Sequence, residues 1–279
     1  MSHKKKYTLA FSPCPNDTFM FHAMVNKLID TEGLEFDYEF EDIETLNNVA
    51  FEEKFDITKI SFNAFGYLSD KYVLLNSGAA LGRGCGPILI SKSDRFYKKP
   101  SEYKIAIPGI YTTANLLLNL MWPEVNNKLP MLFSNIEDAI INDEVDAGLI
   151  IHENRFTYQK KGLHKICDLG EWWENSTGMP IPLGGIAVKR CISDEDKKRI
   201  SRVLSRSIRY AFDNPDASKS FIKEHASEID DNVTSEHIKL YVNKFSLNLG
   251  DEGKNAIRTL YSKALEVKRY KVMHRKLFV

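Results

Sequence analysis

The chain has 279 residues, a length that suits one large domain or two small ones, and its 43% hydrophobic and 27% charged residues are typical of a soluble globular protein. Its 38 Lys and Arg residues balance 38 Asp and Glu residues, so charge gives no support to nucleic-acid binding. Because no apolar run approaches the roughly 20 residues of a membrane helix and the basic start lacks a signal peptide, we expect a cytoplasmic protein without nucleic-acid or membrane partners.

The first element is predicted to be a strand over residues 7–11, followed by a loop over 12–17 that two prolines make stiff. A helix over 18–28 should come next, capped by Asn16 or Asp17. A strand, a tight loop and a helix N-terminus together can bind an anion or a polar ligand through backbone N–H groups.

The four cysteines are scattered and form no CxxC pair, a spacing that is poor for zinc and for a disulfide framework. We therefore expect no metal and free thiols. Cys14 lies in the proline loop, where a helix N-terminus would favour its thiolate. No base is visibly paired with it, so a small side chain packed between two prolines is the favoured interpretation.

Two further strands are predicted over 34–40 and 56–61, joined by a helix over 42–51. Lys59 and Ser61 lie on one face of the second strand because side chains alternate with a period of two. A lysine among apolar neighbours needs a partner, and an anionic ligand would serve. The alternative is an ammonium group that reaches surface water.

A glycine-dense segment over 77–87 matches neither the Walker nor the dinucleotide fingerprint, and we interpret it as a pliable loop before a strand at 88–90. A strand over 104–107 then leads to a helix capped by Thr112 or Thr113. This second helix N-terminus could hold a carboxylate or phosphate, although a cap without a ligand is equally compatible with the sequence.

The apolar strand over 146–151 ends abruptly at His152. Ligands usually meet an α/β sheet at the carboxyl ends of its strands, so the imidazole should stand at the mouth of a cleft. A structural histidine that closes the strand is the alternative. A last strand is predicted over 183–188, and only helices follow, over 195–212, 215–225, 235–245 and 252–267.

Strands and helices alternate twice before these final helices, which predicts two α/β lobes in series with a cleft between them. The chain should cross between the lobes near 88–91 and 186–189. Lobe one would then comprise residues 1–91 with the helices of 190–279 packed on it, and lobe two residues 92–189. The candidate residues fall on both sides of this cleft, which strengthens the case for His152.

Several long segments of the sequence resemble the 1,4-dihydroxy-6-naphthoate synthases, enzymes of the futalosine route to menaquinone. They are SPCPNDTF at 12–19, EDIETLN at 41–47, ALGRG at 80–84, PG at 108–109 with TTA at 112–114, GLIIHENRFTY at 148–158 and YVNKFSL at 241–247. The resemblance covers nearly the whole chain in register.

The resemblance implies a two-lobed α/β fold like that of periplasmic binding proteins of the second type. It implies a carbon–carbon lyase that converts cyclic dehypoxanthinyl futalosine to 1,4-dihydroxy-6-naphthoate without a metal or an organic cofactor. His152 matches the family's general base. The family's substrate-binding positions match Lys59, Ile60 and Ser61 in lobe one and Thr113 and Ala114 in lobe two.

Two alternatives stay open at this point. The same two-lobed fold would suit a non-catalytic protein that binds a small anion, because a fold alone does not decide function. The related chorismate dehydratase shares the fold, although the proline loop and the segment around His152 favour the synthase. The ligand should be a small molecule with a carboxylate, and the sequence leaves open whether the protein forms a homo-oligomer.

Overall fold

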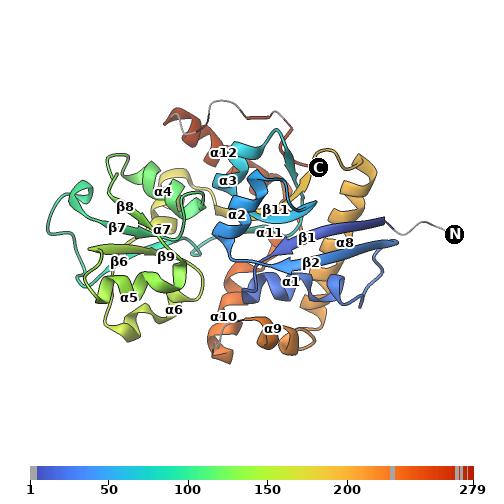
Figure 1. The fold of residues 1–279 in the computed structure, drawn as a ribbon, viewed down its shortest axis with the longest axis horizontal. Coiled ribbons are helices and arrows are strands. Elements are labelled where there is room, and N and C mark those ends of the chain that lie inside the picture. Colours follow the sequence, from blue (N-terminus) through green and yellow to red (C-terminus); the bar gives the residue numbers. More distant parts are fainter. Residues whose placement is uncertain (1–4, 227–229, 268–269, 271–272, 275) are drawn as a thin grey trace.

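The computed structural model describes residues 5–226, 230–267, 270, 273–274 and 276–279. Two β-sheets flanked by helices form two lobes that lie side by side (Figure 1). The sheet of the first lobe has the strand order β2-β1-β3-β11-β4, and β5 pairs with β11. Its strands are β1 (Lys5–Phe11), β2 (Leu34–Phe40), β3 (Ile57–Ser61), β4 (Tyr72–Leu74), β5 (Ala80–Gly82) and β11 (Ile181–Lys189).

Strand β1 pairs in parallel with both β2 and β3, through crossovers that contain α1 (Pro15–Val25) and α2 (Ile43–Phe51). The alternation predicted for 34–40 is present in β2, whose aromatic residues are partly buried between more exposed acids. Strand β11 lies between β3 and β4 in the sheet and runs antiparallel to β3, β4 and β5.

Helix α1 begins earlier than predicted. It starts at Pro15 with Cys14 at the N-cap position, so the prediction of a helix from residue 18 capped by Asn16 or Asp17 is wrong. The fixed φ of proline suits the first turn of a helix, where its missing N–H costs nothing. As a result, the Asp17 carboxylate lies inside the first turn and is available for contacts with β3.

The sheet of the second lobe has the strand order β10-β6-β9-β7-β8. Its strands are β6 (Ile88–Ser91), β7 (Ile105–Ile107), β8 (Lys128–Pro130), β9 (Ala147–Ile150) and β10 (His164–Asp168). The helices of this lobe are α4 (Thr113–Met121), α5 (Ile136–Ile141), α6 (Asn154–Thr157) and α7 (Leu169–Thr177), with short 3-10 turns at Pro100–Glu102, Phe133–Asn135 and Tyr158–Lys161. All residues of β6, β7 and β9 are buried, as expected for central strands covered on both faces.

The lobe boundaries differ from those predicted at residues 91 and 189. Strand β6 pairs with β9 and β10 of the second lobe, whereas β11 pairs with strands of the first lobe. The chain therefore crosses between the sheets at 83–87 and again at 178–180. A strand's own apolar pattern does not reveal its pairing partner, so the sequence located these strands but assigned each to the wrong lobe.

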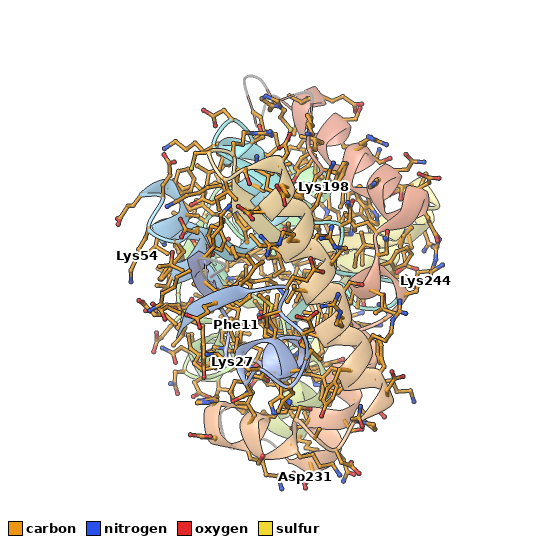
Figure 2. The ribbon with its side chains drawn as sticks, turned by 90° about the vertical axis from the view of Figure 1, so that its right-hand side faces the viewer. Phe11, Lys27, Lys54, Lys198, Asp231 and Lys244 are labelled. Atoms are coloured by element: carbon orange, nitrogen blue, oxygen red, sulfur yellow. The ribbon has the colours of Figure 1, made fainter. Side chains whose placement is uncertain are left out.

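The helices that follow β11 are α8 (Asp194–Asp213), α9 (Lys219–His225), α10 (Asp231–Tyr241), α11 (Lys244–Leu247) and α12 (Gly250–Glu266), and α3 (Phe62–Leu68) follows β3. Helix α8 packs its apolar side on α1 and the first sheet, and Figure 2 shows it running along this face from near Lys198. The helix predicted over 235–245 ends at Tyr241, because Asn243 is extended and caps α11.

Hydrogen bonds link the two lobes across the cleft. The Glu44 carboxylate in α2 accepts from the backbone N–H of Tyr111, and the Asn63 amide in α3 donates to the carbonyls of Ile110 and Thr112. Gly109 makes this approach feasible, since a Cβ there would lie 2.2 Å from the Glu44 carboxyl carbon. Among the residues described, none of the helices has both the length and the apolar character needed to span a bilayer.

Candidate active site

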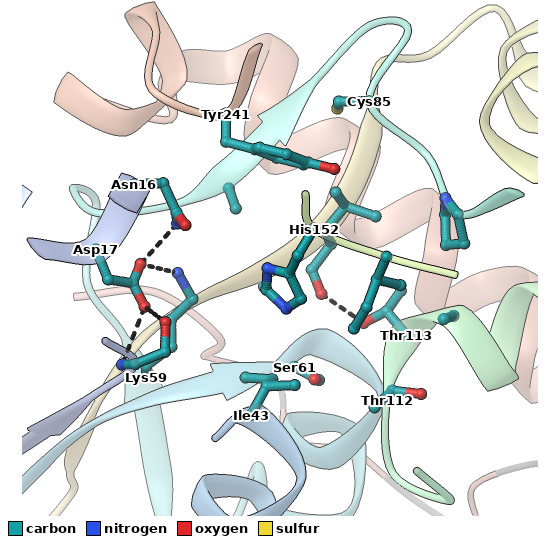
Figure 3. A pocket seen from close by; sticks show the side chains of 17 residues that line it. Asn16, Asp17, Ile43, Lys59, Ser61, Cys85, Thr112, Thr113, His152 and Tyr241 are labelled. Carbon is teal, nitrogen blue, oxygen red and sulfur yellow. Dashed lines mark hydrogen bonds and ion pairs between the residues drawn. The ribbon is translucent and has the colours of Figure 1, made fainter. Parts of the chain in front are cut away.

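A cavity of about 80 Å³ lies between the lobes, and side chains from both lobes line it (Figure 3). Five of the six residues singled out from the sequence reach this cavity, namely Lys59, Ser61, Thr113, Ala114 and His152. The volume is below the roughly 300 Å³ at which small-molecule sites usually begin. A ligand of two or more rings can therefore enter only if the lobes separate.

Ile60 is the sequence candidate that does not line the cavity. Side chains alternate along β3, so Lys59 and Ser61 face the cavity while Ile60 is fully buried in the hydrophobic core. Its backbone lies opposite Gly185 of β11. A direct contact between a ligand and the Ile60 side chain is therefore not available in this arrangement.

His152 follows β9 and projects from the second lobe toward the first (Figure 3). Its φ of 56° lies in the left-handed region, which only a few residue types tolerate and which is found disproportionately at functional sites. Burial lowers the pKa of the imidazole to about 4, with the nearby Lys59 ammonium acting in the same direction and Asp17 opposing it. The side chain is therefore a neutral base at pH 7.

Lys59 has a partner within the protein. Its ammonium nitrogen lies 2.5 Å from Oδ1 of Asp17, and both side chains are buried. The other carboxylate oxygen accepts from the hydroxyl of Ser12 at 2.8 Å, and the Asn16 amide donates to Oδ1 at 2.8 Å. Asp17 thus neutralises Lys59 within the protein. The sequence analysis had left open whether the lysine pairs with a ligand or reaches surface water.

His237 extends this polar network into helix α10, and the sequence analysis did not identify this residue. Its Nε2 lies 2.9 Å from Oδ1 of Asn16, and an amide oxygen only accepts, so Nε2 carries the proton. The ring is stacked on that of His152, with ring centres 6.0 Å apart and planes at 3°. Tyr241, one helical turn further on, lines the cavity directly. The sequence offered one signal for His237. It lies four residues before Tyr241, the first residue of the family-like segment at 241–247, and residues four apart share one face of a helix.

The N-terminus of α4 forms the opposite wall. Thr112 caps the helix by accepting from the Asn115 N–H, which decides between the two predicted caps. The Thr113 hydroxyl donates to the Leu183 carbonyl of β11 at 2.5 Å and so ties the lobes together. The N–H groups of Thr113 and Ala114 belong to the first turn, which has no intrahelical partners for them. They can therefore bind an anionic ligand group.

Cys14 lies on the first lobe opposite His152, with Glu153 beside the imidazole. Burial raises the pKa of the thiol, with the Glu153 carboxylate adding to the effect, so Cys14 is a protonated thiol and not an activated nucleophile. The sulfur, a nitrogen of His152 and a carboxylate oxygen of Glu153 all lie within 4.8 Å of one another. Within the residues described, this is the one group with the donor types and spacing to hold a metal ion.

The two sheets and the cavity between them define a protein with the periplasmic-binding-protein fold. A Candida albicans gene product with this fold superposes with a TM-score of 0.67 at 13% identity, covering 98% of this chain and 92% of that one. The aliphatic sulphonate binding protein of Escherichia coli superposes with a TM-score of 0.66 at 8% identity, covering 98% and 90%. These likenesses show the fold alone.

Residues 7–266 match the family described as "Menaquinone biosynthesis", and the chain belongs to this family. It is 39% identical over 256 residues to 1,4-dihydroxy-6-naphthoate synthase of Thermus thermophilus, covering 92% of this chain and 93% of that protein. The Streptomyces coelicolor enzyme of the same name is 40% identical over 92% of each chain. A crystal structure of an Archaeoglobus fulgidus protein superposes with a TM-score of 0.90 at 37% identity, covering 96% of this chain and all of that one. The family resemblance found in the sequence is thereby confirmed.

Replacing Asp17 by Asn should destabilise the protein by about 3–5 kcal/mol, because Lys59 would remain buried without a counter-charge. Urea denaturation would measure the free energy of unfolding. The double variant with Asp17→Asn and Lys59→Met should lose less than the sum of the single changes. Glu39→Gln, at the exposed pair with Lys54, is the matched control and should cost about 1 kcal/mol or less. Additive losses in the double variant would show that the buried pair contributes nothing.

Proposed function

We propose that this protein is a carbon–carbon lyase that converts cyclic dehypoxanthinyl futalosine to 1,4-dihydroxy-6-naphthoate, with His152 as the general base. The observation that carries the proposal is a neutral imidazole, with a pKa lowered to about 4, in a cavity enclosed by both lobes. Relatives that bear the name of this synthase and match over most of the chain support the choice of reaction.

The proposed chemistry requires a base and little else from the protein. Opening a sugar ring that is spiro-fused to a carbocycle, and aromatising that carbocycle, needs removal of a proton followed by cleavage of a carbon–carbon bond. A positioned neutral imidazole typically contributes about 10²–10⁴-fold to such a step. Aromaticity of the product supplies driving force, so the protein needs no electron sink.

We further propose that the substrate's carboxylate binds at the N-terminus of α4. Thr113 and Ala114 line the cavity, and their N–H groups belong to the first helical turn, where they have no intrahelical partners and the helix dipole favours negative charge. Lys59 is paired with Asp17, and its ammonium has two further donors for ligand hydroxyls. Ser61 can contribute one more polar contact from the first lobe. Binding from both lobes would favour the closed form.

Incubation of the protein with the cyclic substrate, followed by chromatography for the naphthoate, tests the reaction directly. Catalytic production at many turnovers per protein molecule is expected. Stoichiometric binding without product would instead support the alternative of a non-catalytic binding protein. Conversion of chorismate under the same conditions would identify the related dehydratase.

His152→Asn should lower kcat by at least about 10²-fold while substrate affinity is largely kept, because the amide is not basic. Asparagine is the appropriate replacement, since it tolerates the positive φ of 56° at this position. Steady-state kinetics and a binding titration with the product give the two quantities. Near-normal turnover by a folded variant would remove His152 from the mechanism.

The acidic limb of the kcat/KM profile should have its midpoint near pH 4, because the imidazole with its lowered pKa of about 4 loses its basicity only when it is protonated. The rate should therefore be level from about pH 5 up to neutrality. Circular dichroism at each pH controls for acid unfolding. A limb centred on the ordinary histidine pKa of 6.5 would contradict a base that is buried in this way.

A comparison of Thr113→Pro with Thr113→Val tests how much the backbone N–H group of residue 113 contributes to ligand binding. Both substitutions remove the hydroxyl, but only proline also removes the N–H group. Proline is compatible with this position because Thr113 is the first helical residue and Thr112 before it is extended, with a ψ of 149°. Proline should weaken binding of 1,4-dihydroxy-6-naphthoate about 10-fold more than valine does, as expected for a charge-assisted hydrogen bond. The methyl ester of the product should bind both variants alike. Equal affinity of both variants for the free acid would place the carboxylate elsewhere.

A further inference from the structure

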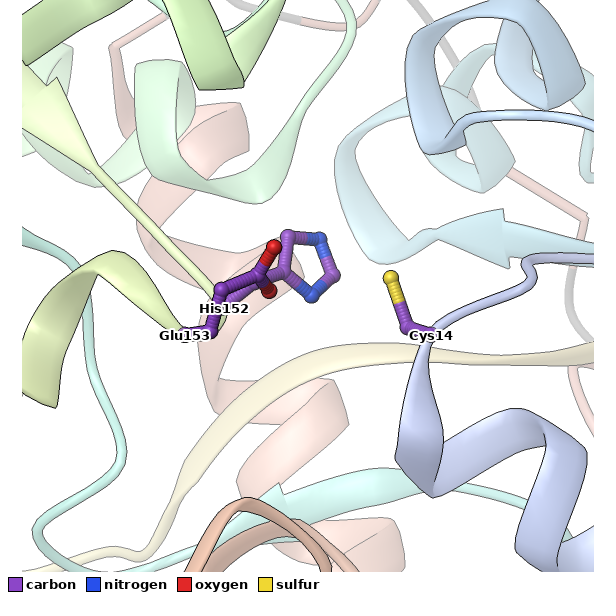
Figure 4. Close-up of side chains that lie close together, drawn as sticks. All are labelled: Cys14, His152 and Glu153. Atoms are coloured by element: carbon purple, nitrogen blue, oxygen red, sulfur yellow. The ribbon is translucent and has the colours of Figure 1, made fainter. Parts of the chain in front are cut away.

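We propose that Cys14, His152 and Glu153 form a site between the lobes for a thiophilic divalent cation such as Zn²⁺, which holds the lobes closed and occupies the base. Figure 4 shows the Cys14 sulfur facing the imidazole across the cleft, with the Glu153 carboxylate next to the ring. A thiolate, an imidazole and a carboxylate are the ligand types that zinc binds in proteins.

The spacing of the three donor atoms is close to that of a metal site. They lie within 4.8 Å of one another. Tetrahedral zinc with bonds of about 2.0–2.3 Å needs its ligand atoms roughly 3.3–3.8 Å apart, so the donor atoms must approach by at most about 1–1.5 Å. Rotation of the Glu153 and Cys14 side chains between staggered conformers can move their donor atoms by this amount. Three protein ligands leave the fourth position of the cation for water.

A second observation points to a ligand at this place. Oε2 of Glu153 is buried and has no hydrogen-bond partner among the residues described. A buried carboxylate oxygen without a partner is costly, and a bound cation would satisfy it.

Binding releases one proton. Because a thiolate and not a thiol binds the cation, the Cys14 thiol proton passes to water as the metal–sulfur bond forms.

The position of the site gives the cation two effects. Cys14 is the N-cap residue of α1 in the first lobe, whereas His152 and Glu153 follow β9 of the second lobe, so a cation bound to all three joins the lobes. It would also take the imidazole lone pair that accepts the substrate proton. This inhibitory effect depends on the proposed function of His152, whereas cation binding does not.

Titration of the chelator-treated protein with CoCl₂ tests binding, because a thiolate–cobalt bond gives a charge-transfer band in the near ultraviolet. Wild type should develop this band at one equivalent, and ZnCl₂ should abolish it by competition. Cys14→Ser should abolish the band, and Glu153→Gln should weaken cobalt binding roughly tenfold or more. Cys191→Ser is the matched control, since Cys191 is an exposed thiol away from the site, and it should leave the band unchanged.

The proposed site is wrong if wild type develops no charge-transfer band at millimolar cobalt. It is also wrong if the band persists in folded Cys14→Ser or Cys14→Ala. The inhibitory effect is measured separately, as loss of turnover in ZnCl₂ that EDTA restores. If cobalt binds through Cys14 and turnover is unaffected by zinc, the site stands and the role of His152 as base is what fails. If turnover is inhibited without a Cys14-dependent band, the cation acts elsewhere and the proposed site is wrong.

Discussion

The buried ion pair between Lys59 and Asp17 is the contact on which the shape of the cavity depends. A lysine in a strand whose residues are all buried must have a counter-charge, and Asp17 provides it from the first turn of α1. The pair therefore fixes α1 against β3. Asn16 extends the same hydrogen-bond network to His237, so helix α10 is held at the cavity as well. Three segments that are distant in the sequence meet through one charge pair.

Burial is the main cause of the lowered pKa of His152, and the ion pair adds two smaller effects. The Asp17 carboxylate raises the pKa of the imidazole and the Lys59 ammonium lowers it, so these two effects oppose each other. A lysine without its partner would place an uncompensated positive charge beside the imidazole. With the pair intact, the cavity keeps a neutral imidazole next to a polar wall of fixed charge. Such a preorganised environment would suit the proposed proton transfer to His152 better than an aqueous one.

The contacts between the lobes fit a cleft that opens and closes. Glu44 accepts from Tyr111, Asn63 donates to Ile110, and Thr113 donates to Leu183. Water can replace each of these hydrogen bonds, so each contributes only about 0.5–1.5 kcal/mol to the closed form. Two crossings of the chain connect the lobes, which permits hinge motion without breaking either sheet. Closure then brings His152 and the first-lobe polar groups around one small cavity.

The sequence by itself determined the two-lobed α/β class, the strands and helix that carry the candidate residues, and five residues that line the cavity, because these follow from local periodicity, chain order and long motifs. It did not indicate the short strands β4, β5, β8 and β10, and it took the segment that contains β5 for a loop. It did not determine which sheet β6 and β11 join, since pairing partners lie far away in the chain. Nor did it identify Asp17 as the partner of Lys59, or His237 and Tyr241 as neighbours of the site. Only the tertiary structure decides such contacts. A buried charge or polar atom needs a partner, and that partner can come from a segment far away in the sequence.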